Sequence, residues 1–337
     1  MLPEMDGKAV SDLGEFGLIE RLRRRLADAA AAGVEIGPGD DAAAVDTGPS
    51  TLLAADMLVE GIHFDLAFSS LADAGYKAVA VNVSDIAAMG GMPRYLLVSL
   101  GLPEGVSVTA VDALYDGMLE AAGETGCAIV GGDVTGAPQI VVSVSVAGEP
   151  GPAGVLRRSG AQEGDVLCVT GALGVAGAGL ALMRAAADPR AVALLDAYPA
   201  LAAAHRRPLP RVAAGPAAAE AGAHAMIDVS DGFARDAAHI AEESGLGLVV
   251  DGASLPVTAG VSDAAGFLGV EAAVLAASGG DDYELAIAVP PDRVEAVRSA
   301  IAPLPLTVAG AFGGTDRVFV HARERIPLRE LGWEHFA

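Results

Sequence analysis

The 337-residue sequence predicts a pair of α+β or α/β domains. The chain is long enough to build two hydrophobic cores. Strand-like and helix-like segments alternate along both halves, and acidic turns recur where strands are expected to end. The segment GEPGPAG, residues 148–154, has the Pro and Gly content of a linker. We therefore expect an N-terminal domain over residues 1–150 and a C-terminal domain over residues 151–337.

The elements of the first half follow from apolar periodicity. Phe16, Ile19, Leu22 and Leu26 recur at helical spacing, which predicts an amphipathic helix over residues 15–32. Further helices are expected at residues 71–89 and 109–125. Short strands are expected at residues 51–55, 95–100, 128–130 and 139–147. In this scheme Asp56 and the GGD sequence at 131–133 directly follow strands.

The second half continues the alternation. Strands are expected at residues 165–170, 225–229, 246–251, 284–289, 306–312 and 317–321. Helices are expected at residues 175–187, 208–221, 233–244 and 293–301. The uncharged run from Val166 to Met183 approaches the length of a membrane span. Its glycines favour a strand, a turn and a helix start instead.

Charge and composition exclude several classes of function. The net charge of −23 argues against a nucleic-acid or anionic membrane partner, because both need clustered Lys and Arg. The lysines are Lys8 and Lys77, and no P-loop sequence is present. Cys127 and Cys168 are expected to be free, buried thiols. The N-terminus lacks the features of a signal peptide, so the expected location is cytoplasmic.

Acidic turns are the main chemical signal. Turns that end in Asp suit Mg²⁺, which binds carboxylate oxygens and keeps other positions for water and substrate phosphates. The natural metal-binding set comprises Asp40, Asp41, Asp56, Asp85 and Asp133. The alternatives are a cap for Asp40, ordinary turn chemistry for Asp133 and a solvated helix position for Asp85. Together with the missing kinase and hydrolase motifs, the set favours metal-assisted phosphoryl transfer without a covalent intermediate.

Other candidate residues each have a structural alternative. Ser230-Asp231-Gly232 precedes a predicted helix, where it would cap the helix or bind phosphate. The turn from Thr170 to Gly174 is a weaker phosphate candidate. His63 would contact a phosphate or hydroxyl, or serve a structural role. Trp333 is the sole Trp and would either anchor packing or stack on a flat heterocycle.

Ordered motifs from residue 14 to the C-terminus resemble those of the thiamine-monophosphate kinases. The motifs are GEFGLI (14–19), GDDAAAV (39–45), DMLVEGIHF (56–64), YKAVAVNVSDIAAMGGMP (76–93), GGDVTG (131–136), RSGAQEGDVLCVTGALG (158–174), IDVSDGFARD (227–236), SGGDDYEL (278–285) and GWEHF (332–336). This family belongs to a superfamily with aminoimidazole ribonucleotide synthetase, selenophosphate synthetase and a hydrogenase maturation factor.

The resemblance implies a fold and a reaction. Each domain would have the aminoimidazole ribonucleotide synthetase-like fold, a mixed sheet with packed helices. The enzyme would phosphorylate thiamine monophosphate to thiamine diphosphate with ATP and several Mg²⁺ ions, by direct in-line transfer. It would be a homodimer whose N-terminal domains, which bind metal and ATP, pair with each other.

The resemblance also assigns roles to individual residues. The implied metal ligands are Asp41, Asp56, Asp85, Asp133, Asp228 and Asp231, with Asp85 and Asp133 the most critical. The implied ATP contacts are Gly132, Asp133, Arg158, Ser230 and Tyr115. The implied substrate contacts are His63, Asp281 and Trp333.

Two departures from the family pattern stand out. Ala54 and Ala55 replace the hydroxyl residues that usually precede the acid matching Asp56, and Asp281 replaces a Glu. The alternative interpretations are another ATP-using member of the superfamily, similar to the hydrogenase maturation factor, and a catalytically weakened metal-binding paralogue.

Overall fold

The computed structural model describes residues 18, 21–22, 24–26, 34–36, 44–46, 48 and 50–333. Asp40 and Asp41 of the expected metal set lie outside the described residues. The described chain divides into two compact units. Unit 1 ends at Ile86 and resumes over residues 93–149, and unit 2 comprises residues 87–92 and the chain from Pro150 onward.

Unit 1 is built around a four-stranded mixed sheet in the order β3-β6-β4-β5. Its strands are β3 (Leu52–Val59), β4 (Gly91–Leu102), β5 (Ala128–Gly136) and β6 (Val141–Pro150). β3 and β6 are antiparallel, whereas β4 and β5 are parallel. A separate antiparallel pair joins β1 (Val34–Ile36) to β2 (Ala44–Val45). The sheet is therefore mixed, as the sequence predicts.

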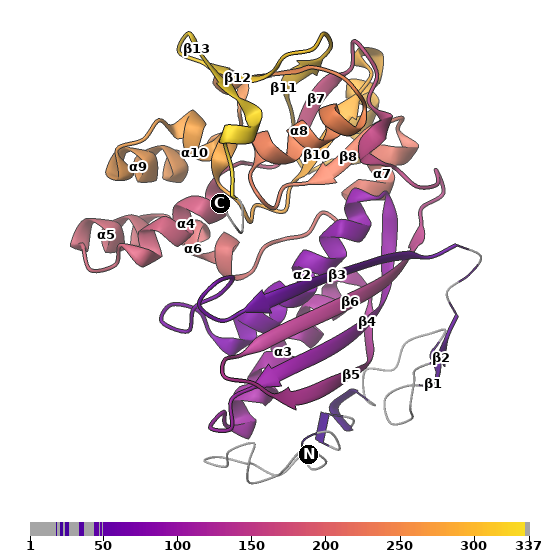
Figure 1. Cartoon of the computed structure of the whole chain (residues 1–337), viewed down its shortest axis with the longest axis vertical. Coiled ribbons are helices and arrows are strands. Elements are labelled where there is room, and N and C mark those ends of the chain that lie inside the picture. The colour runs from indigo at the N-terminus through magenta and orange to yellow at the C-terminus, as the bar shows by residue number, and fades with distance from the viewer. Residues whose placement is uncertain are drawn as a thin grey trace. The chain divides into compact units, whose positions relative to one another are not determined.

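Two helices, α2 (Leu71–Ala88) and α3 (Val108–Thr125), lie against one face of this sheet (Figure 1). The two helices approach each other through glycines. A Cβ atom on Gly75 would lie 1.9 Å from the carbonyl oxygen of Leu114, and one on Gly117 would lie 1.8 Å from that of Ala72. Only residues without a side chain permit this backbone contact, so the two glycines set the helix spacing.

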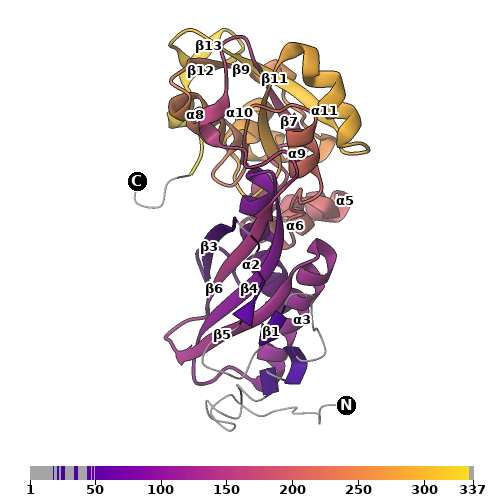
Figure 2. The same cartoon turned by 90° about the vertical axis from the view of Figure 1, so that its right-hand side faces the viewer.

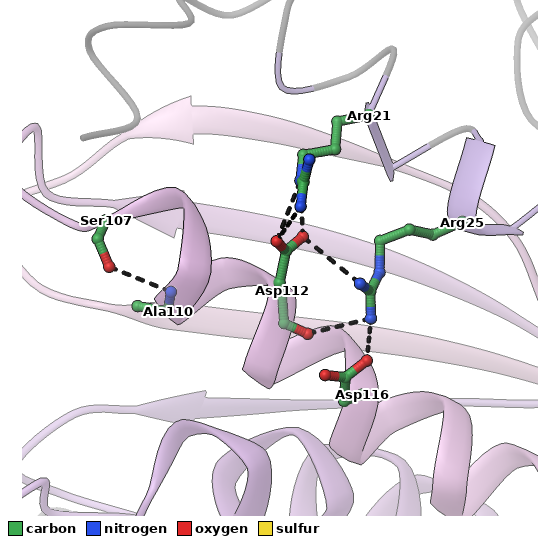
Figure 3. A network of polar contacts seen from close by, with 6 residues as sticks. All are labelled: Arg21, Arg25, Ser107, Ala110, Asp112 and Asp116. Carbon is green, nitrogen blue, oxygen red and sulfur yellow. Dashed lines mark hydrogen bonds and ion pairs between the residues drawn. The ribbon is translucent and has the colours of Figure 1, made fainter. Parts of the chain in front are cut away.

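Ion pairs tie the N-terminal segment to α3 (Figure 3). The Nε atom of Arg21 donates to Oδ1 of Asp112 at 2.8 Å, and Arg25 pairs with Asp116. Arg25 also donates to the backbone oxygen of Asp112 at 3.2 Å. Arg21 and Arg25 are four residues apart, so one helical face carries both guanidinium groups. These pairs join the segment that carries Arg21 and Arg25 to α3 within unit 1.

Unit 2 is built around a seven-stranded mixed sheet in the order β13-β12-β9-β11-β7-β10-β8. The strands are β7 (Val166–Thr170), β8 (Ala225–Asp228), β9 (Leu248–Asp251), β10 (Leu285–Val289), β11 (Leu306–Phe312), β12 (Arg317–His321) and β13 (Glu324–Pro327). β12 pairs with β9 in parallel, whereas β10 is antiparallel to both β7 and β8.

Helices cover both faces of this second sheet (Figure 2). The helices of unit 2 are α4 (Val175–Arg184), α5 (Pro189–Ala197), α6 (Pro199–Arg206), α7 (Ala214–Glu220), α8 (Phe233–Glu243), α9 (Ala259–Leu268), α10 (Ala272–Ser278) and α11 (Val294–Ala300). Leu167 and Val169 of β7 pack in one core with α8 and α10, whereas Cys168 packs in another with α7 and α11. The alternation of side chains in β7 thus places apolar residues in both cores.

The predicted two-domain α+β architecture is confirmed, but several boundaries were wrong. The strand predicted at 51–55 continues to Val59, so Asp56 lies inside β3 rather than at its end. The strand predicted at 128–130 continues through Gly136 because it pairs with β4 along that length. The helix predicted at 208–221 begins only at Ala214, since Pro208 and Pro210 interrupt the preceding segment. Helices α5, α6, α9 and α10 were not predicted.

Among the described residues, no single helix is long and apolar enough to cross a membrane. One bent pair, α9 and α10, passes the same test of length and composition only when both helices are taken together. The run from Val166 to Met183 forms β7, a turn and most of α4, as predicted.

The glycine contact between α2 and α3 generates a stability prediction. Gly117→Ala should lower the free energy of unfolding by about 1–3 kcal/mol, because the new methyl group overlaps the Ala72 carbonyl. Gly123→Ala is the matched control on the same helix, where a Cβ atom meets nothing within 4 Å. That control should raise stability by up to about 1 kcal/mol through helix propensity. Urea denaturation followed by circular dichroism measures both, and equal effects would refute the close contact.

Candidate functional site

The turn between β8 and α8 is organised by a carboxylate that the sequence analysis did not single out. Oδ2 of Asp236 accepts hydrogen bonds from the backbone N–H groups of Ser230, Asp231 and Gly232, at 2.9, 3.0 and 3.2 Å. Asp236 lies one turn inside α8 and is 2 % exposed. Gly232 is the N-cap residue and has a φ of 122°, so neither Ser230 nor Asp231 caps the helix.

These bonds weaken the alternative that the free N–H groups of this turn bind phosphate, while the ATP contact expected of Ser230 stays a prediction. The three N–H groups that would face an anion already donate to Asp236. Burial raises the pKa of Asp236 well above its usual value, and the charges of Asp228 and Asp231 raise it further. The backbone hydrogen bonds oppose this shift. The turn is therefore acidic, a setting that suits a cation better than an anion.

The turn that follows α10 repeats this arrangement. Asp282 is buried, and its carboxylate accepts from the N–H of Gly174 at 2.5 Å and from that of Ala176 at 3.0 Å. Burial raises the pKa of Asp282 to about 7, against the opposing effect of these two bonds. The Gly-rich turn from Thr170 to Gly174 was a weak phosphate candidate. Its helix-start donors are instead occupied by the protein's own carboxylate.

An ion pair between the partly exposed Arg211 and the buried Glu284 holds the other end of the acidic turn. Glu284 accepts from Arg211 at 2.5 and 2.8 Å and from the hydroxyl of Thr170 at 2.6 Å. A Cβ atom on Gly171 would lie 1.8 Å from the Glu284 carboxylate. The missing side chain at Gly171 thus leaves room for the Glu284 carboxylate. Gly171 also has a φ of 58°, in the left-handed region that Gly adopts easily.

Backbone hydrogen bonds bring several expected site residues together in unit 2. The N–H of Asp281 donates to the oxygen of Ser230, and the N–H of Trp333 donates to the oxygen of Asp231, both at 2.8 Å. The Trp333 residue is 57 % exposed, unlike a packing anchor. Asp228 ends β8 and is buried. Metal-side and substrate-side candidates therefore share one corner of this unit.

Arg158 is placed differently from Ser230, although both were expected to contact ATP. The hydroxyl of Ser244, beyond the C-terminal end of α8, donates to the backbone oxygen of Arg158 at 3.2 Å. Ser230 instead precedes the N-terminal end of α8. The Arg158 side chain is exposed. Its expected ATP contact stays a prediction.

In unit 1, Asp56 and Asp85 lie near one buried amide. The N–H of Asp56 donates to Oδ1 of Asn82 at 2.9 Å, and Asn82 precedes Asp85 by three residues on α2. Asp56 is exposed and Asp85 is half-buried. Asn82 is 1 % exposed and also donates to the oxygen of Ala78 at 2.9 Å. This amide therefore fixes the middle of β3 against α2. Because Asn82 and Asp85 share one face of α2, Asp85 lies on the side of the helix that meets β3.

Gly132 and Asp133 occupy β5 rather than a turn. A Cβ atom on Gly132 would lie 1.8 Å from the oxygen of Val98, so the close approach of β4 alone requires Gly here. Asp133 is exposed and opposite Ser99. β3 and β5 are the two edges of the sheet, about 14 Å apart at three strand spacings. Asp56 and Asp133 are thus separated within one chain.

His63 is held in a defined tautomer. Its Nδ1 accepts from the N–H of Val59 at 3.1 Å, so the neutral ring carries its proton on Nε2. Nζ of Lys77, which is 2 % exposed, donates to the oxygen of His63 at 3.0 Å. His63 can therefore present an N–H donor to a phosphate or hydroxyl.

Tyr115 lies in the core of unit 1 at 3 % exposure, and burial raises its pKa. Its expected ATP contact stays a prediction.

In the part of the chain that the structure describes, no three His, Cys, Asp or Glu side chains form a group that could hold a metal ion. Asp41 lies outside that part. Mg²⁺ commonly uses only one or two carboxylates together with substrate phosphates. In unit 2, Asp228 at the end of β8 and Asp231 in the turn before α8 provide two carboxylates of the kind that such a site needs.

The chain matches two families over most of its length. The AIR synthase related protein N-terminal domain matches residues 39–149, and the AIR synthase related protein C-terminal domain matches residues 162–323. Thiamine-monophosphate kinase of Mycobacterium tuberculosis is 37% identical over 98% of this chain and 94% of its own length. The chain belongs to the thiamine-monophosphate kinase family.

Solved structures of the thiamine-monophosphate kinase family share the fold. The enzyme from Stenotrophomonas maltophilia is 37% identical with a TM-score of 0.77, over 89% of this chain and 94% of that one. A structure described as AaThiL complexed with AMPPCP and TMP is 32% identical with a TM-score of 0.74, over 96% and 98%. Hydrogenase maturation protein HypE, at 21% identity and a TM-score of 0.68, shares the fold alone.

The buried carboxyl of Asp282 predicts a pH-dependent stability difference. Burial raises its pKa to about 7 in the folded chain, well above the ordinary value of an Asp carboxyl. The unfolded chain therefore ionises first as pH rises, and this group's contribution to stability falls. Asp282→Asn stays neutral. Relative to wild type, its free energy of unfolding should therefore rise between about pH 4 and about pH 7, by up to about 4 kcal/mol.

Urea denaturation of both proteins across that range measures the difference. Asp188→Asn is a control of opposite sign, because hydrogen bonds from Arg190 lower the pKa of the Asp188 carboxyl. The free energy of unfolding of wild type should therefore increase relative to that of Asp188→Asn as pH rises. A difference for Asp282→Asn that does not change with pH would contradict the raised pKa.

Proposed function

We propose that this chain transfers the γ-phosphoryl group of ATP to the phosphate of thiamine monophosphate, forming thiamine diphosphate and ADP. Family membership over nearly the full length supports this reaction. The structural observation that carries it is the corner of unit 2. There, backbone hydrogen bonds join Ser230 to Asp281 and Asp231 to Trp333. Asp231, which would bind a cation, therefore lies near Asp281, which would bind the cationic ring of the substrate, and near the exposed indole of Trp333.

The reaction needs no general base. A substrate phosphate oxygen is already anionic, attacks the γ-phosphorus and displaces ADP, so the protein mainly aligns the groups and stabilises charge. Bound Mg²⁺ would neutralise the phosphates. The residues that would bind Mg²⁺ ions are, in unit 1, Asp41, Asp56, Asp85 and Asp133. In unit 2 they are Asp228 and Asp231. The Nε2–H of His63 would donate to a substrate phosphate or hydroxyl.

We propose a homodimer formed through unit 1. Leu53 and Met57 of β3 and Leu97 of β4 are 78%, 52% and 47% exposed. Leu53 and Met57 are four residues apart on β3 and therefore share one face of that strand. An apolar sheet face of this kind favours pairing with a second copy. The cytoplasmic location expected from the sequence stays a prediction.

The weakened-paralogue alternative rests on Ala54 and Ala55. Both lie in β3, an edge strand of the unit 1 sheet. An edge strand leaves backbone groups along one side without strand partners. Backbone oxygens could therefore bind a cation where the family uses hydroxyl residues, so this departure does not exclude turnover.

A substrate test decides the proposed reaction. Purified protein with ATP, Mg²⁺ and thiamine monophosphate should form thiamine diphosphate and ADP, and EDTA should abolish the reaction. Chromatographic separation of the thiamine phosphates gives the readout. Phosphorylation of unphosphorylated thiamine, with none of the monophosphate, would refute the assignment.

Removing single metal-side charges tests the role of the acids. Asp133→Asn and Asp231→Asn should each lower kcat by roughly 10²-fold, the loss typical of a transition-state charge stabiliser. Thermal melting should be nearly unchanged, because both residues lie at accessible positions. Asp196→Asn on the exposed face of α5 is the control for loss of one negative charge. Wild-type turnover in both variants at limiting Mg²⁺ would assign these acids to ordinary structural roles.

A further inference from the structure

His205, at the end of α6, contacts the acidic turn of unit 2. Its Nδ1 atom lies 3.2 Å from Oδ2 of Asp281, which is within ion-pair distance but not in hydrogen-bond geometry. The His205 side chain is 4% exposed, whereas that of Asp281 is 30% exposed. Among the carboxylates of this turn, Asp282 and Glu284 are buried and bound by other groups. Asp281 is therefore the carboxylate of the turn that is both accessible and held from inside the protein.

The backbone of Asp281 adopts a conformation that needs support. Its φ is 67°, in the left-handed region, and that of Tyr283 is 50°. The hydroxyl of Tyr283 donates to Oδ1 of Asp281 at 3.3 Å. Tyr283 and His205 thus contact different oxygens of one carboxylate. Together they restrict its rotation and leave its outer side for a ligand.

The position of His205 is fixed by tight packing of α6. A Cβ atom on Gly179 of α4 would lie 2.0 Å from the oxygen of Leu201, so the two helices touch through their backbones. Six residues after His205, Arg211 binds Glu284 of the same acidic turn. One short segment therefore contacts both ends of the turn.

We propose that His205 is a positioning residue that directs the Asp281 carboxylate toward the cationic heterocycle of the substrate. The inference rests on the proposed function, and it adds a determinant of substrate affinity outside the substrate-contacting set. A carboxylate held at a fixed angle loses less conformational freedom on binding a cationic ring than a mobile one does. His205 acts through Asp281 alone and does not affect ATP.

The test compares two variants of nearly equal shape. Leu at position 205 removes the polar contact, whereas the Asn amide nitrogen occupies the place of Nδ1. His205→Leu should raise KM for thiamine monophosphate by about 10-fold, because the close polar contact to the Asp281 carboxylate is lost. His205→Asn should stay within about 2-fold to 3-fold of wild type. Neither variant should change KM for ATP or kcat by more than about 2-fold.

A double-mutant cycle separates positioning from packing. In an Asp281→Ala background, His205→Leu should have no further effect on KM, because the residue through which it acts is gone. Direct titration of Trp333 fluorescence with thiamine monophosphate, without ATP, should reproduce the shifts as changes in Kd. Equal losses in the Asn and Leu variants, or an additive effect in the double variant, would overturn the inference.

Two further outcomes are informative. If the Leu variant does not fold, His205→Gln takes its place, since its longer side chain puts the amide near the position of Nε2 and should fail where Asn succeeds. If wild-type protein does not turn over thiamine monophosphate, the proposed function fails. If it does and His205→Leu leaves KM and Kd unchanged, only the positioning role is overturned.

Discussion

Burial of the carboxylates of Asp236, Asp282 and Glu284 constrains the functional corner of unit 2. A buried carboxylate is costly unless hydrogen-bond donors surround it. Asp236 is bound by three backbone N–H groups and Asp282 by two, whereas Glu284 is bound by Arg211 and Thr170. Most of these donors are the backbones of the turns themselves. The acids are satisfied only if the turns adopt the observed conformations, so the turns are rigid.

This arrangement divides the acids into two kinds. The inner carboxylates, Asp282 and Asp236, bind the N–H groups at the starts of α4 and α8. In other proteins such N–H groups often hold a phosphate. The outer carboxylates, Asp231 and Asp281, remain partly exposed on the same turns. With few lysines and these backbone donors already bound, the protein offers negative charge where a polyphosphate would have to lie. Such a surface suits a phosphate that arrives with its own cations.

The sequence predicted the alternation of elements well where strands are short and bounded by turn residues. Residues 306–312 and 317–321 form β11 and β12 with the expected ends. It failed at Gly131–Asp133, because only pairing with β4 shows that a glycine-rich sequence continues a strand. Helices α5 and α6 were missed although a Pro follows the cap of each, a usable signal. At nine and eight residues, both helices are shorter than the window of about 11 residues over which a helical period becomes clear.

The candidate acids were found from local sequence, but their partners were not. Asp282 binds the backbone of Gly174, 108 residues away, and no local pattern predicts such a contact. Asp236 was within reach of prediction, since an acid four residues after the Gly of SDG can fold back onto the helix start.

The left-handed backbone of Asp281 bears on the replacement of the family's Glu by Asp at this position. Asp is among the non-glycine residues most tolerant of a positive φ, because its short side chain bonds locally, whereas a longer acid is less suited to it. Asp in place of Glu shortens the reach of the carboxylate and lowers the conformational cost of the positive φ at this position. At this position a shorter reach toward a ligand is therefore coupled to a less costly left-handed backbone.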